Sequence, residues 1–166
     1  MRQIPFFLFL FTLSTVTQCN GDTDTETAER HAGRTVEPTH SLEILNEQQD
    51  RVVASVRVAL AQTDQERNTG LMDVRHMPFD TGMYFIFENE EPRSFWMANT
   101  PLSLDILFVN RQNRIVRIHT RTVPFSERQI RSELPAMYTL EVNAGFVSEH
   151  DIREGMYVRL VESGEP

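Results

Sequence analysis

The sequence predicts a mainly β domain, either a single compact β-sandwich or a distorted barrel, with about seven short strands and two small helices. Two observations lead to this fold class. Apolar and polar residues alternate across residues 52–61, which is the period of a strand with one buried face. Further short apolar segments follow, separated by turn-forming residues, and helical patterns are few and short.

The first helix is predicted at residues 64–72, directly after that strand. Thr63 and Glu66 have the spacing of a capping box, in which the hydroxyl and the carboxylate each accept a hydrogen bond from a free backbone amide. Gly70 weakens the end of the helix, and Pro78 prevents its continuation because proline has no amide hydrogen. The helix is therefore short.

The other strands are predicted from apolar segments between turns. They occupy residues 82–87, 93–97, 104–109, 114–120, 137–142 and 156–161. The first of these has apolar residues on both faces, which indicates a central strand. Asn110 and Asn113 bound a hairpin turn, because Asn tolerates the left-handed conformation that short turns need. We expect a loop over residues 121–135 and a short helical turn over residues 145–150.

The chain divides into three parts. Residues 1–18 predict a secretory signal peptide, since Arg2 precedes a 13-residue apolar run that is shorter than the roughly 20 residues of a membrane-spanning helix. Residues 19–41 predict an acidic, Thr-rich linker with almost nothing apolar to bury. Residues 42–163 remain for one β-rich domain with one core.

Cys19 is the only cysteine and directly follows the apolar run. The segment resembles a bacterial lipobox, in which the cysteine becomes the lipid-modified first residue, although Gln18 stands where a small residue is usual. We therefore expect an exported protein of the bacterial cell envelope, lipid-anchored through Cys19 on the periplasmic or outer face. Plain secretion is the alternative.

Composition and motifs argue against several function classes. The 16 basic residues, all Arg, face 24 acidic residues and leave a formal net charge of −8. This balance argues against nucleic-acid binding and against membrane contact beyond the lipid anchor. Phosphate-binding glycine loops and a nucleophile elbow are absent from the sequence. His76, His119 and His150 lack the spacing of a zinc site, so we expect neither a metal nor a cofactor.

The most informative segment spans residues 94–109. It places the only Trp, Trp96, an Asn99-Thr100-Pro101 turn and Asp105 inside otherwise strand-like apolar sequence. Such polar residues need hydrogen-bond partners if they are buried. Something beyond hydrophobicity therefore selected them.

These residues, with motifs on both sides, resemble the FWMxNTxxxLD signature of a family of small exported domains, domain of unknown function 192. The motifs are Glu66-Arg67, Gly70-Leu71-Met72, Gly82-Met83, Phe95-Trp96-Met97, Asn99-Thr100, Leu104-Asp105, Leu140-Glu141 and Ala144-Gly145. The resemblance implies a compact β-rich fold in exported or membrane-tethered proteins, and no established substrate. Ala98 stands where a Lys is common in the family and Tyr84 where Leu is common, so any chemical role of that Lys is missing here.

Asp105 is the first candidate for a functional residue. If its neighbours at 104, 106 and 108 face the core, Asp105 points the other way, beside Leu107 and Val109, where a carboxylate needs a donor. It is either a ligand anchor or general acid/base, or a structural acceptor for backbone amides at the 99–101 corner or for Arg67.

Our leading hypothesis is a non-catalytic binding module whose shallow pocket receives a small-molecule ligand or an envelope protein. The predicted ligand-binding residues are Trp96, Asn99, Thr100, Asp105, Arg67 and Met72. The alternative is an enzyme with Asp105 as general acid or base, assisted by Glu141, His119 or Arg67. For Glu141, a solvated position on the polar face of its strand is the simpler interpretation. A purely structural or assembly factor is the third hypothesis.

Overall fold

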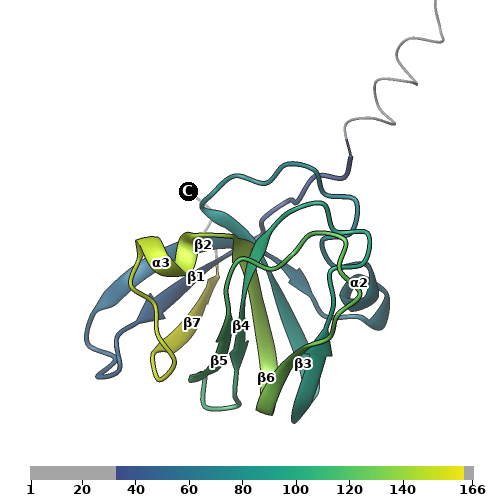
Figure 1. Cartoon of the computed structure of the whole chain (residues 1–166). Coiled ribbons are helices and arrows are strands. Elements are labelled where there is room, and N and C mark those ends of the chain that lie inside the picture. The colour runs from purple at the N-terminus through teal and green to yellow at the C-terminus, as the bar shows by residue number, and fades with distance from the viewer. Residues whose placement is uncertain (1–32, 163–166) are drawn as a thin grey trace, which may run out of the picture. The chain divides into compact units, whose positions relative to one another are not determined.

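The structure, a computed structural model, describes residues 33–162 (Figure 1). The predicted signal peptide at residues 1–18, the lipid attachment at Cys19 and the linker up to residue 32 lie outside the described residues. So does residue 163, the predicted end of the domain.

Seven strands form one sheet in the order β5-β4-β6-β3-β2-β1-β7. The strands are β1 (His40–Leu45), β2 (Val52–Ala61), β3 (Thr81–Phe95), β4 (Leu104–Val109), β5 (Ile115–His119), β6 (Ile130–Asn143) and β7 (Tyr157–Glu162). The helices are α2 (Asp64–Thr69) and α3 (Phe146–Glu149). Every strand pair is antiparallel except β2 with β3, which are parallel and joined through α2.

The sheet curls on itself (Figure 1), and its two edge strands meet at one end. There Arg114, just before β5, forms an isolated bridge with Tyr157 of β7. The amide of Ile115 also donates a hydrogen bond of 2.8 Å to the carbonyl of Met156. The predicted mainly β fold is confirmed, and of its two predicted forms the structure matches the distorted barrel.

Two hydrophobic clusters flank the sheet. All seven strands contribute to the inner core, together with α3; its strand residues are Leu42, Ile44, Ala54, Val56, Val58, Tyr84, Leu107, Val109, Ile115, Leu140, Val142 and Val158. The outer core lies on the other face, and it consists of Ala61, Leu71, Val74, Met77, Met83, Phe85, Met97, Leu104, Ile106, Phe108 and Ala136. Because successive residues of β4 alternate between the two clusters, the strand is buried on both faces.

Local sequence signals predicted several elements correctly. The bounds of β2 and β4 are those expected. Thr63 caps α2, and both hydrogen bonds of the capping box are present. Asn113 has the left-handed φ of 61° expected for the hairpin turn. The helical turn expected over residues 145–150 is present as α3 with its two caps.

Three predicted boundaries are wrong. Strand β1 begins at His40, inside the predicted linker, and Arg34 already bridges to Val74. Residues 93–95 are not a separate strand but the end of β3, and Trp96 and Met97 lie beyond it. Strand β6 begins at Ile130, within the expected loop, and it includes Pro135, which lies opposite Pro92 beside a break in strand register.

Candidate functional site

Asp105 is a structural residue. Its side chain is fully buried, on the inner-core face that the alternation predicted. Oδ1 accepts a hydrogen bond of 2.8 Å from the amide of Arg121, and Oδ2 accepts two of 3.0 Å from the amides of Gly145 and Val147. These donors lie at neither of the places expected, the 99–101 corner and Arg67. Since the fold engages both oxygens, this geometry favours the structural alternative for Asp105 over ligand binding or catalysis.

A pocket of about 430 Å³ lies on the outer face of the sheet. Four of the predicted ligand-binding residues line it: Arg67, Met72, Trp96 and Thr100. The structure therefore brings together residues from α2, the segment after it, and the chain leaving β3. Asn99 does not line this pocket; it is exposed, has a φ of 55°, and its carbonyl accepts the amide of Asp73.

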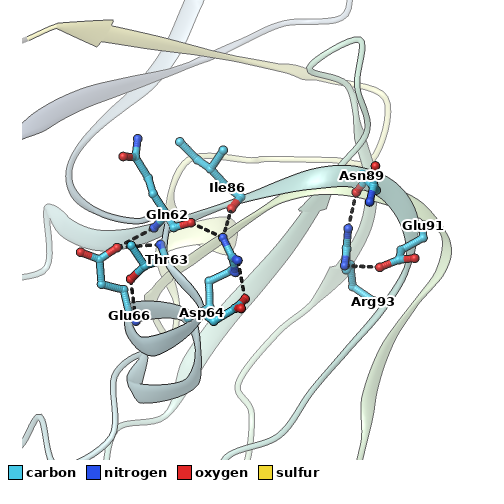
Figure 2. A network of polar contacts seen from close by, with 9 residues as sticks. Gln62, Thr63, Asp64, Glu66, Ile86, Asn89, Glu91 and Arg93 are labelled. Carbon is cyan, nitrogen blue, oxygen red and sulfur yellow. Dashed lines mark hydrogen bonds and ion pairs between the residues drawn. The ribbon is translucent and has the colours of Figure 1, made fainter.

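The capping box positions the helical wall of the pocket (Figure 2). Glu66 accepts hydrogen bonds of 2.9 Å from the amides of Gln62 and Thr63, which lowers the pKa of its carboxyl. The next residue, Arg67, donates to the carbonyl of Ile86 at 2.8 Å and pairs with Asp64 at 2.6 Å. These contacts connect the helix to β3 and hold the guanidinium in place.

Glu141 on β6 also lines this pocket. Its cross-strand partners are Met83 of β3 and Ile106 of β4, so its side chain shares their face and points into the outer core. The residue is 4% exposed. The predicted solvated position is therefore wrong, because the segment after α2 covers this face of β6.

Burial raises the pKa of Glu141 to about 8. Across residues 33–162 its carboxyl has no hydrogen bond or ion pair, and burial is the cause of the shift in its pKa. Its oxygens are not among the fully enclosed polar atoms without a partner in the described residues, Arg117 Nε and Thr139 Oγ1, so they reach solvent through the pocket. The opening that remains to Glu141 is the pocket that it lines.

The predicted catalytic candidates do not come together. Asp105 lies opposite Val142 and Glu141 lies opposite Ile106, so the two carboxylates point to opposite faces of the sheet. His119 lines a different cavity, and its Nε2 is 2.8 Å from the carbonyl oxygen of Arg131. In the described part of the chain, no group of three His, Cys, Asp or Glu residues is placed to hold a metal ion.

The sequence did not identify Glu141 as the central residue of the pocket. Thr139 and Glu141 alternate with apolar Leu140 and Val142, which is also the pattern of a solvated strand face. A strand under a covered pocket produces the same pattern. No signal within β6 separates the two cases.

None of the described helices is long and apolar enough to cross a membrane.

The fold and the site define a small curled-sheet domain with a ligand-sized pocket on its outer face. The chain belongs to the DUF192 family, described as "Uncharacterized ACR", whose model matches residues 44–160. This confirms the resemblance seen in the sequence motifs. A search of the curated proteins found no match.

Two solved structures are similar to this chain. One, from Sinorhizobium meliloti 1021, is described as a "putative transcription regulator"; it is 34% identical, with a TM-score of 0.70 over 76% of this chain and 96% of that chain. The other is a protein of unknown function from Novosphingobium aromaticivorans DSM 12444. It is 27% identical, with a TM-score of 0.67 over 80% of this chain and 96% of that chain.

Proposed function

We propose that this domain is a binding module that receives a small molecule in the pocket lined by Glu141. The observation that carries the proposal is Glu141, a residue 4% exposed, whose carboxyl has no partner among the described residues and opens onto the pocket. A ligand group that pairs with it would compensate for its loss of water. Buried, strongly shifted carboxyls in pockets are typical of functional sites.

The walls of the pocket support binding of a small organic molecule. Aromatic side chains from β3 and the chain beyond it, Phe85, Phe87, Phe95 and Trp96, provide apolar surface, and Met72 faces them from the segment after α2. The volume of about 430 Å³ falls within the roughly 300–1,000 Å³ of small-molecule sites. Trp96, 56% exposed, stands at the mouth of the pocket, where its ring can close over a ligand.

Binding is favoured over catalysis by the composition of this wall. Arg67 and Glu141 are the ionisable side chains that line the pocket, and Arg67 is already engaged by Asp64 and two backbone carbonyls. One unassisted carboxyl provides neither a nucleophile with its base nor an acid/base pair.

The proposed location is the cell envelope, with the domain held by a lipid on Cys19. The apolar run that ends just before this cysteine and the polar segment that follows it support the proposal. Cys19→Ser should move the protein from the membrane fraction of a bacterial lysate to the soluble fraction. Retention of the variant on membranes would contradict lipid anchoring.

The acidic charge of −8 gives no support for extending transcription regulation from the similar structure to this chain.

Methyl NMR with a neutral aromatic probe tests the pocket. We propose titrating protein labelled at its methionine methyl groups with 2-naphthylmethanol. The Met72 methyl resonance should shift and saturate, because Met72 lines the pocket. The methyl of Met156, packed against the inner core, is the internal control and should stay in place. No saturable shift at Met72, or equal shifts at both methionines, would overturn the proposal.

A further inference from the structure

The chemistry of the pocket favours one sign of ligand charge. Glu141 places a carboxyl on its wall, and the rings of Phe85, Phe95 and Trp96 lie on the same cavity. Aromatic faces attract cations through the negative charge above the ring, and a desolvated carboxylate attracts them more strongly. The aromatic faces, and Glu141 once it is ionised, would repel a ligand anion.

The cations already present on this side of the sheet are used elsewhere. The guanidinium carbon of Arg93 lies 4.0 Å from the centre of the Phe87 ring, and that of Arg67 lies 5.3 Å from it. The aromatic ring of Phe87 therefore already accommodates positive charge. Arg93 pairs with Glu91 (Figure 2), and Arg67 pairs with Asp64, both at 2.6 Å. Neither supplies Glu141 with a counter-ion.

We propose that the ligand is an organic cation, an ammonium group carried on an aromatic or other apolar body. This inference rests on the proposed function of the pocket. The ammonium group donates hydrogen bonds to the Glu141 carboxylate, and the body packs between Met72 and the rings of Phe95 and Trp96. Hydrophobic walls that enclose a charged pair strengthen its attraction because they exclude water.

Binding of such a cation exchanges one proton. At neutral pH the empty pocket holds Glu141 largely protonated, because burial raises its pKa to about 8. The ammonium pairs with the carboxylate, so the carboxyl proton leaves for solvent as the ligand enters, and the net charge of the site is unchanged. The affinity for the cation should therefore rise about tenfold per pH unit below about pH 8, and level off above it.

The surroundings of Glu141 contain little else that titrates in this range. Arg67 of α2 lines the same pocket. The neighbours from β3 and β4 are Met83 and Ile106, which do not titrate. The pH dependence is thus assigned to Glu141.

The test compares 2-naphthylmethylammonium with 2-naphthylmethanol, which have the same shape and differ in charge. Binding is followed by the Met72 methyl shift between pH 6 and 8.5, in the wild type, Glu141→Gln and Glu149→Gln. The last variant is the matched control, because it makes the same Glu-to-Gln substitution at an exposed position outside the pocket. The wild type should bind the ammonium at least tenfold more tightly than the alcohol at pH 8, with a preference that falls as the pH falls. Glu141→Gln should bind the two alike, and Glu149→Gln should match the wild type.

The outcomes separate this inference from the proposed function. If the wild type binds the alcohol as tightly as the ammonium at every pH, the pocket stands and the cation is wrong. If neither compound shifts Met72, the proposed function fails, and this inference fails with it. Should Glu141→Gln fold poorly, the pH dependence of the wild-type preference decides alone, since a preference that does not change with pH contradicts the proton exchange.

Discussion

The carboxylate of Asp105 accepts a hydrogen bond of 3.0 Å from the amide of Val147, a residue 42 positions later in the chain. The same oxygen accepts the amide of Gly145, and the other oxygen accepts the amide of Arg121. Asp105 thus fixes two segments against β4, the loop after β5 and the start of α3. One side chain takes the place of backbone pairing where these segments have no strand partner.

Replacing Asp105 should therefore affect stability first. Asp105→Ala leaves three amides without their acceptor, at a cost of about 1–3 kcal/mol for each one that water does not reach, so we expect a loss of at least about 3 kcal/mol. Urea unfolding followed by the fluorescence of Trp96 measures it. Glu127→Ala, at an exposed position, is the control and should change stability by less than about 0.5 kcal/mol. An Asp105→Ala protein as stable as the wild type would contradict the structural role.

Glu141 should make the protein less stable as the pH rises. Its pKa is raised from 4.5 to about 8 in the folded state, so between these values the unfolded chain loses a proton that the folded chain keeps. Stability then falls by on the order of 1.4 kcal/mol per pH unit across this window, and this contribution is constant above and below it. Glu141→Gln removes the effect and should be the more stable protein at pH 8. Denaturation of both proteins from pH 4 to 9 measures the difference, and parallel curves would contradict the burial of this carboxyl.

Gly82 should tolerate no side chain. A Cβ atom there would lie 2.5 Å from the carbonyl oxygen of Glu141, which belongs to the backbone of the neighbouring strand. Gly82→Ala must push β3 and β6 apart below the pocket, and we expect a loss of roughly 2 kcal/mol or more together with weaker probe binding. Thermal unfolding of Gly82→Ala measures this loss. A Gly82→Ala protein as stable as the wild type would show that this steric contact is relieved.

Arg34 should stabilise the wall of the pocket from the N-terminal side. Its side chain donates hydrogen bonds to the carbonyls of Gly70 and, at 3.0 Å, Met72. Arg34→Ala should lower the global stability by only about 1 kcal/mol, but should speed amide hydrogen exchange in the segment 70–74. Arg51→Ala, an exposed arginine outside this segment, should leave that exchange unchanged. Equal rates of amide hydrogen exchange at residues 70–74 in Arg34→Ala and the wild type would show that Arg34 does not stabilise this wall of the pocket.

Much of the fold could be predicted because its signals are local. The alternation across β2 and the capping box of Thr63 with Glu66 each lie within a few residues, and the structure contains both as expected. Strand β1 was missed because its six residues carry a weak pattern, and its burial depends on two partners, β2 and β7, that lie later in the chain. Strand β6 was shortened because the sequence does not reveal that Pro135 lies opposite Pro92.

The residues of the site also fall into these two groups, those with a local sequence signal and those whose role depends on distant parts of the chain. By itself, the sequence determined that a family-typical set of residues, Arg67, Met72, Trp96 and Thr100, was present, and the fold gathers them on one pocket. It also determined which face of β4 carries Asp105. Only the tertiary structure decided that Asp105 is consumed by backbone donors 16, 40 and 42 positions away, and that Glu141 is covered rather than solvated. The physical reason is that alternation fixes the side of a strand on which a residue lies, whereas its chemistry depends on what distant part of the chain packs over that side.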